Sequence, residues 1–212
     1  GYTVHLGGNI STPLFDRIAD IRPDDFAVLE LSSFQLHSMH CAPDVAIITN
    51  ISPNHLGVHP DFEDYVSAKC SIYRGQRPDG VLVLNAKDAH TPRFAAEAPG
   101  SVRYFSSIGP VENGVYCSDG VIYRAHGGKA EKLIDVSDVR IPGAHNVENY
   151  MAAFAATDGL VGQAACVQVA RSFAGVPHRM ERIRELNGIT FINDSIASSP
   201  TRTIAGLHAL PK

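Results

Sequence analysis

Short apolar runs rich in β-branched residues alternate along the chain with segments whose apolar residues recur at helical spacing. Runs of this kind are typical of strands that are buried on both faces of a mostly parallel sheet. The runs cover residues 26–31, 45–51, 80–84 and 102–105, and the helical segments cover residues 13–20, 62–73 and 88–98. This alternation predicts an α/β fold with a mostly parallel central sheet flanked by helices.

The pattern changes in the second half of the chain. Residues 115–117 and 121–123 alternate around Ser118-Asp119-Gly120, which predicts a β-hairpin. We therefore expect a small antiparallel β annex over about residues 102–140. Helical spacing returns at 146–160 and 164–173, and is followed by a predicted strand at 189–192 and a final helix near 201–210.

Composition narrows the class of protein. The chain has 212 residues with 18 Lys+Arg against 22 Asp+Glu, so it lacks the basic excess that is typical of nucleic-acid-binding proteins. With 44% apolar residues we expect a globular protein. The four cysteines form no C-x-x-C motif, which favours reduced thiols. No apolar run approaches the roughly 20 residues of a membrane span, and no signal peptide is present, so we expect a cytoplasmic protein.

Polar side chains follow several of the predicted strands. Glu30 and Ser32 end the first strand, His55 lies in the turn after the second, and Asp194 follows the last. Ligand sites in open α/β sheets form at such strand ends. Each residue alone has an ordinary explanation, because a strand-end glutamate can simply reach water and a turn histidine is usually a surface residue. Lys69, inside a predicted helix, is a weak signal by itself, since most helix lysines are solvated.

Two further motifs could bind an anionic ligand. Asn146 and Asn149 are three residues apart at a predicted helix start, where carboxamides can contact a purine edge and the helix N-terminus favours anions. Capping by Asn146 is the ordinary alternative. Arg179 lies in a turn after Pro177, and would bind phosphate in a bidentate manner if it pointed inward.

A zinc hydrolase is a competing hypothesis, because several potential ligands lie close together in the sequence. They are His37, His40, Cys41, His55 and His59. None of the usual zinc spacings, such as H-E-x-x-H, occurs, which disfavours this interpretation.

Together the motifs resemble the Mur ligase family over nearly the whole chain. The stretches that carry the resemblance are GGNI at 7–10, ELSSFQL at 30–36, Asn50 to His55, Ala68-Lys69, H-N-x-x-N at 145–149, PHRME at 177–181 and NDS at 193–195. The ELSSFQL string discriminates best among the branches of the family, and is similar to the branch that adds D-glutamate to UDP-N-acetylmuramoyl-L-alanine. The resemblance implies the fold of the family's central, ATP-binding domain.

The resemblance also implies a reaction and its cofactors. ATP would phosphorylate the alanine carboxylate to an acyl phosphate, which the amine of D-glutamate would then attack. Glu30, His55 and a carbamylated Lys69 match the family's catalytic residues and its ligands for two Mg²⁺ ions. Asn9, Ser32 and His55 match positions that contact the UDP-sugar substrate. The positions that hold ATP correspond to Asn146, Asn149, Arg179 and Asp194.

Some features depart from the family pattern. The phosphate-binding G-x-x-G-K-[ST]-[ST] loop does not occur in the 212 residues, and Ile196 replaces a common lysine. The resemblance therefore implies a central domain over residues 1–212 without its P-loop strand and helix, with the N-terminal UDP-binding and C-terminal glutamate-binding domains absent or only begun. We expect a monomer that cannot turn over by itself. The alternative is a stand-alone nucleotide or sugar-nucleotide binding module.

Overall fold

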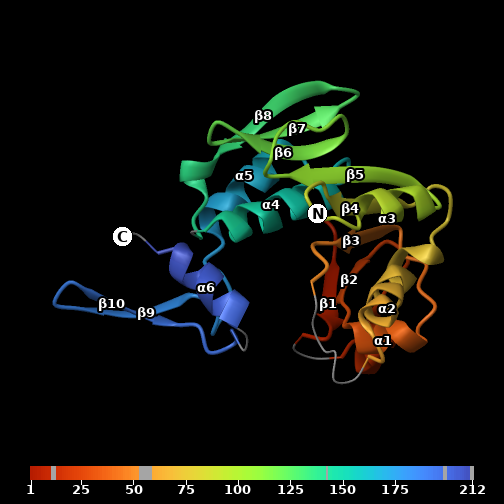
Figure 1. The fold of residues 1–212 in the computed structure, drawn as a ribbon, viewed down its shortest axis with the longest axis horizontal. Coiled ribbons are helices and arrows are strands. Elements are labelled where there is room, and N and C mark those ends of the chain that lie inside the picture. The colour runs from red at the N-terminus through yellow and green to blue at the C-terminus, as the bar shows by residue number, and fades with distance from the viewer. Residues whose placement is uncertain (11–12, 53–58, 142, 198–199, 211–212) are drawn as a thin grey trace.

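A computed structural model describes the chain except for residues 11–12, 53–58, 142, 198–199 and 211–212. Its largest element is a six-stranded sheet with the strand order β3-β4-β5-β6-β7-β8. The first four strands are parallel, and β6, β7 and β8 continue the same sheet in antiparallel pairs (Figure 1). The strands are β3 (Val45–Ile48), β4 (Val81–Asn85), β5 (Ser101–Ser106), β6 (Gly114–Ser118), β7 (Val121–His126) and β8 (Lys129–Asp135).

Helices cover both faces of this sheet and create two hydrophobic cores. On β4, Leu82 and Leu84 belong to one core and Val83 to the other, because successive strand residues point to opposite faces. The first core contains residues of α2 and α3, and the second contains residues of α4 and α5. The four helices are α2 (Phe62–Arg74), α3 (Thr91–Glu97), α4 (Ala144–Ala156) and α5 (Gln163–Ser172).

The N-terminal part forms a separate, two-stranded parallel sheet of β1 (Val4–Gly8) and β2 (Phe26–Glu30). Strand β2 was expected to be buried on both faces of the central sheet, and this is wrong, because its last four residues are exposed. The predicted helix at 13–20 is a short 3-10 helix, Phe15–Asp20, which has no side-chain cap. Helix α1 (Ser33–Ser38) follows β2 and packs against α2.

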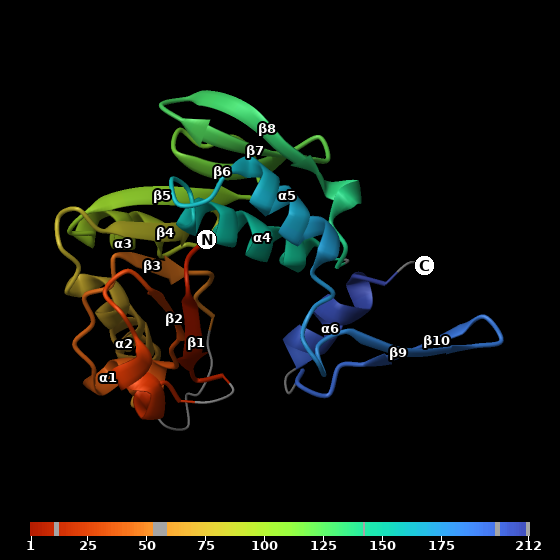
Figure 2. The same ribbon diagram turned by 180° about the vertical axis from the view of Figure 1, so that it is seen from behind.

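The C-terminal part stands apart from the six-stranded sheet at the other end of the molecule (Figures 1 and 2). It consists of the antiparallel hairpin of β9 (Glu181–Leu186) and β10 (Ile189–Asn193), and of helix α6 (Pro200–His208). A 3-10 turn, Val136–Asp138, follows β8.

The predicted fold class is confirmed, as are the hairpin around Ser118-Asp119-Gly120 and the main helices. Strands β8 and β9 and the short helix α1 were not predicted from the sequence. None of the helices in the described part of the chain has the length and hydropathy to span a membrane.

Candidate active site

Glu30 and Lys69 come from different elements, and the charge of Glu30 influences the ionisation of the Lys69 amine. Glu30 is the exposed last residue of β2, and Lys69 is a half-buried residue of α2. Burial lowers the pKa of the Lys69 amine below its ordinary value, and the nearby Glu30 carboxylate opposes this shift without cancelling it. The pair therefore combines a carboxylate with an amine that loses its proton more readily than a solvated lysine does.

The end of β1 fixes the backbone beside Glu30. Gly8 has a φ of +101°, a conformation that favours glycine, and a Cβ at this position would overlap the backbone oxygen of Glu30. The next residue, Asn9, donates its backbone N–H to that oxygen at 2.6 Å. The structure thus brings the exposed residue Asn9 next to Glu30.

Ser32 begins helix α1 two residues after Glu30. Its hydroxyl accepts the backbone N–H of Gln35 at 3.3 Å, and its own N–H donates to the Gln35 side chain at 2.9 Å. This reciprocal capping box was visible in the sequence as S-x-x-Q, and it is the signal that could have predicted α1. The hydroxyl of Ser32 therefore orders the turn between Glu30 and α1.

His55 lies outside the described residues, so its predicted place in the site stays a prediction. The chain before it is held at Ile51, whose N–H donates to the Asp88 carboxylate at 2.6 Å. Asn85, at the end of β4, donates to the backbone oxygen of Thr49 at 3.1 Å. These contacts order the strand end from which the segment with His55 departs.

The residues predicted to hold ATP lie on two parts of the fold, the start of α4 and the turn before β9 together with the end of β10. Asn146 is buried in the first turn of α4, and Asn149 is exposed one turn later. Asp194 accepts the backbone N–H of Met180 at 3.1 Å, which places it beside the turn that carries the exposed Arg179.

Helix α6 lies close to Asp194 and to the residue that precedes α4. A Cβ on Gly206 of α6 would lie 3.0 Å from an Asp194 carboxylate oxygen, and a Cβ on Gly143, just before α4, would lie 2.8 Å from the Cβ of Ala209. The end of α6 therefore lies close to the start of α4. The Glu30–Lys69 group lies on β2 and α2, at the opposite end of the molecule from β9, β10 and α6 (Figures 1 and 2).

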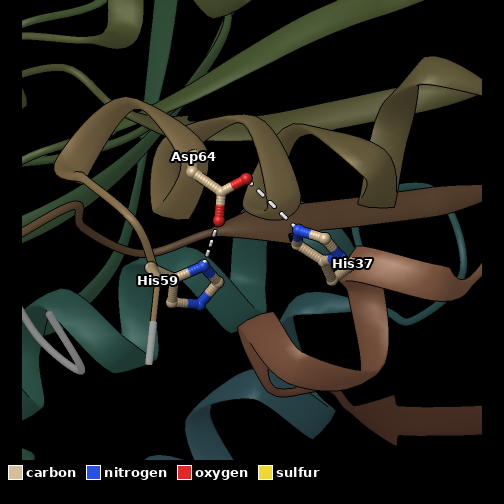
Figure 3. Close-up of side chains that lie close together, drawn as sticks. All are labelled: His37, His59 and Asp64. Atoms are coloured by element: carbon tan, nitrogen blue, oxygen red, sulfur yellow. Dashed lines mark hydrogen bonds and ion pairs between the residues drawn. The ribbon is translucent and has the colours of Figure 1, made fainter. Parts of the chain in front are cut away.

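Sequence reasoning missed one cluster that the fold assembles: His37, His59 and Asp64 (Figure 3). Two imidazoles contact the two oxygens of one carboxylate, with 2.6 Å from His59 Nδ1 and 3.2 Å from His37 Nε2. These hydrogen bonds lower the pKa of Asp64, and the bond from His59 has the largest effect. Both histidines were noted in the sequence, but Asp64 was not. The available signal was a carboxylate in the first turn of the helix that follows His59.

Comparison with known proteins assigns the chain to a family. Residues 9–157 match the Mur ligase middle domain, so the chain belongs to the Mur ligase family. Two curated relatives have the same name. The chain is 50% identical over 209 residues to a protein of Acetivibrio thermocellus named UDP-N-acetylmuramoylalanine--D-glutamate ligase, and 47% identical over 212 residues to a protein of that name from Clostridium botulinum. The matches cover 99% and 100% of this chain but only 45% of each relative, so the chain spans less than half of their length.

Solved structures of other Mur ligases have the same fold. The chain matches MurF from Acinetobacter baumannii with a TM-score of 0.69 and 20% identity, over 99% of this chain and 54% of that one. It matches MurF from Thermotoga maritima in complex with ADP with a TM-score of 0.67 and 21% identity, over 99% of this chain and 51% of that one. At this identity the likeness concerns the fold alone.

Proposed function

We propose that this chain serves an ATP-dependent ligase that joins D-glutamate to UDP-N-acetylmuramoyl-L-alanine in the synthesis of peptidoglycan precursors. The observation that carries the proposal is the half-buried Lys69, whose amine pKa is lowered by burial and is partly restored by the charge of Glu30. The pair occurs in a chain that is 50% identical to a ligase of that name.

The residues present fit the two Mg²⁺ ions and the carbamylated lysine that the family implies. A lysine takes up carbon dioxide only as the neutral amine, and burial lowers the pKa of Lys69 in that direction. A carbamate beside the Glu30 carboxylate would present oxygen ligands, which Mg²⁺ prefers, and His55 would be a further ligand. When bound, Mg²⁺ would neutralise the negative charges of the substrate carboxylate and the γ-phosphate.

The remaining residues have binding and orienting roles in this proposal. Asn9 and Ser32, on either side of Glu30, would contact the UDP-sugar substrate together with His55. The alanine carboxylate would attack the γ-phosphate of ATP, which forms the acyl phosphate and releases ADP. The amine of D-glutamate would then displace phosphate and form the amide bond.

The other group of predicted residues would hold ATP. In this proposal Asn146 and Asn149 contact the adenine, while Arg179 and Asp194 bind the phosphates and the ribose. The Arg179 guanidinium is suited to phosphate because its planar fork donates two parallel hydrogen bonds. Arg179 and Asp194 lie beside α6 and the β9–β10 hairpin, at the opposite end of the molecule from β2 and α2 (Figures 1 and 2), so the proposal requires them to approach the Glu30–Lys69 pair when both substrates are bound.

A chimeric enzyme tests the function. The 212 residues would replace the matching segment of the Acetivibrio thermocellus relative, and phosphate release would be measured with UDP-N-acetylmuramoyl-L-alanine, D-glutamate, ATP and Mg²⁺. We expect turnover that requires every component. Lys69→Ala should reduce kcat by roughly 1,000-fold, the effect of losing one electrostatic contact to the transition state. Lys129→Ala, which changes an exposed lysine on β8, should have no effect.

The outcome that contradicts the proposal is a folded chimera, verified by circular dichroism, whose turnover survives Lys69→Ala. The 212-residue chain alone is expected not to turn over, because the phosphate-binding loop does not occur in it. Calorimetric titration of the chain with ATP distinguishes the ligase proposal from the alternative, a stand-alone nucleotide or sugar-nucleotide binding module. A stand-alone nucleotide-binding module should bind ATP unaided, whereas the ligase proposal predicts no measurable binding.

A further inference from the structure

Three donor side chains from separate segments meet beside α1 and α2. His37 lies in the last turn of α1, His59 precedes α2, and Asp64 lies in the first turn of α2 (Figure 3). One ligand atom from each residue lies within 4.8 Å of the other two. No short sequence motif contains these residues, because the fold of α1 against α2 brings them together.

The His59 ring is held by its surroundings. It is only 4% exposed, and its Nε2 lies 3.0 Å from the hydroxyl of Ser33, which is 2% exposed. Phe34 stacks on the ring with a centroid distance of 5.4 Å, and Tyr65 meets its edge at 5.5 Å. These contacts direct Nδ1 toward Asp64. A second partner on the far nitrogen is the usual arrangement of a metal-binding histidine, since it fixes the tautomer and the ring orientation.

The other two donors are arranged in complementary ways. Asp64 is held at the helix start, where its backbone N–H donates to the side chain of Asp61 at 2.8 Å. The His37 side chain is 56% exposed, so it can rotate and gives an ion access from solvent. The site thus combines two ordered ligands with one adjustable ligand.

We propose that His37, His59 and Asp64 bind one Zn²⁺ ion. Two imidazoles and one carboxylate are a donor set that suits zinc, whereas Mg²⁺ sites are built mainly from oxygen ligands. Ligands of a tetrahedral zinc site lie about 3.3 Å apart, for metal–ligand distances of about 2.0–2.1 Å. Donors that already lie within 4.8 Å of one another need only small side-chain movements to reach this geometry. The fourth position would be taken by water.

This site is distinct from the Glu30–Lys69 pair. Asp64 and Lys69 are five residues apart on α2, which separates them by about 7.5 Å along the helix and by roughly 140° around it. The ion would connect the end of α1 to the start of α2. The proposal does not depend on the ligase function, because neither substrate binding nor turnover enters the argument.

Zinc binding to the 212-residue chain tests the proposal without an activity assay. Calorimetric titration with Zn²⁺ should show one site that excess Mg²⁺ does not compete for. Titration with Co²⁺ should give the visible absorption of a tetrahedral site without a thiolate band. His37→Ala and Asp64→Asn should each weaken Zn²⁺ binding by roughly 100-fold or more, since loss of a supporting contact alone typically costs about 10–100-fold.

Matched controls come from the neighbouring surface. His40 and Cys41 line a hollow of about 430 Å³ next to His37, so His40→Ala and Cys41→Ser should leave Zn²⁺ affinity unchanged. Binding that is lost in Cys41→Ser but not in His37→Ala would assign the ion to the thiol and overturn the proposal. Absence of Zn²⁺ binding would also overturn it, and the hydrogen bonds of Asp64 would then be the whole role of the cluster. If Asp64→Asn unfolds the chain, the exposed His37→Ala variant decides.

Discussion

Strands β2 and β4 have similar sequences but different surroundings. Both are five residues long, FAVLE in β2 and VLVLN in β4, and each ends in a polar residue. Strand β4 lies between β3 and β5 with helices on both faces, and its last four residues are buried. Among the described strands β2 pairs only with β1, and its last four residues are exposed.

The two terminal polar residues differ accordingly. Asn85, at the end of β4, is buried and uses its carboxamide inside the fold, where it donates to Thr49 and accepts the N–H of Lys87 at 3.1 Å. Glu30, at the end of β2, is exposed, and its charge raises the pKa of Lys69 against the effect of burial. The comparison teaches that a polar residue at a strand end has a structural role where the sheet is covered and is open to a ligand where it is not.

The largest expected effect distinguishes the stability of the two regions. Leu84→Ala removes a fully buried side chain from β4 and should lower the free energy of unfolding by about 2–5 kcal/mol. Leu6→Ala, in β1, truncates a side chain that is 54% exposed, and should change the free energy of unfolding by no more than about 0.5 kcal/mol. Urea unfolding measures both. Equal losses would show that β1 and β2 are as well packed as the central sheet.

A smaller effect is expected from Gly8→Ala at the end of β1. The new Cβ would overlap the Glu30 backbone oxygen in a backbone conformation with φ of +101°, which should cost about 1–3 kcal/mol. Hydrogen exchange of the Asn9 amide, which donates to that oxygen, should accelerate by roughly 5- to 150-fold. Gly188→Ala, with φ of +77° and no atom near its Cβ, is the control and should leave Asn9 unaffected. Unchanged Asn9 exchange in Gly8→Ala would contradict the close approach.

The smallest effect concerns the pH dependence of the β1–β2 region. Hydrogen bonds from His5, at 2.9 Å, and from the Arg22 N–H, at 3.0 Å, lower the pKa of Asp25. The stabilisation by the ionised Asp25 carboxylate is therefore present above the ordinary aspartate pKa of about 3.9. It is lost as the pH falls through the lower pKa that Asp25 has in the folded protein.

Asp25→Asn should reduce stability slightly at pH 6 and flatten its decline below about pH 4. Urea midpoints at several pH values measure this. Asp16→Asn, which changes an exposed residue of the 3-10 helix, should leave the decline of the urea midpoint with falling pH unchanged. If the urea midpoint declines with pH in the same way for Asp25→Asn and for the unchanged chain, ionised Asp25 does not stabilise the β1–β2 region.

Much of the fold could be predicted because burial periodicity is a local property. The runs that became β3, β4 and β5, and the helices α2 and α4, carry their patterns within single segments. The exposure of β2 could not be predicted, since FAVLE has the composition of a buried strand, and only its neighbours decide whether it is covered. Helix α1 was missed because six residues are too few to show helical periodicity.

The candidate site was predictable only in part. Glu30 and Lys69 were identified through motifs, and the charge of Glu30 influences the pKa of the half-buried Lys69, while their roles in a site stay a prediction. The cluster of His37, His59 and Asp64 could not be found from spacing, because it depends on how α1 packs against α2. Contacts between segments that are distant in sequence are properties of the tertiary fold, and local patterns do not encode them.

The most direct test of the central claim is the pKa of the Lys69 amine, measured by NMR titration of its side chain in this chain and in Glu30→Gln. We predict that Lys69 titrates below the ordinary lysine value of about 10.4, and lower still in Glu30→Gln, because the carboxylate that favours its charged form is removed. An ordinary pKa for Lys69 that does not respond to Glu30→Gln would contradict a shared site.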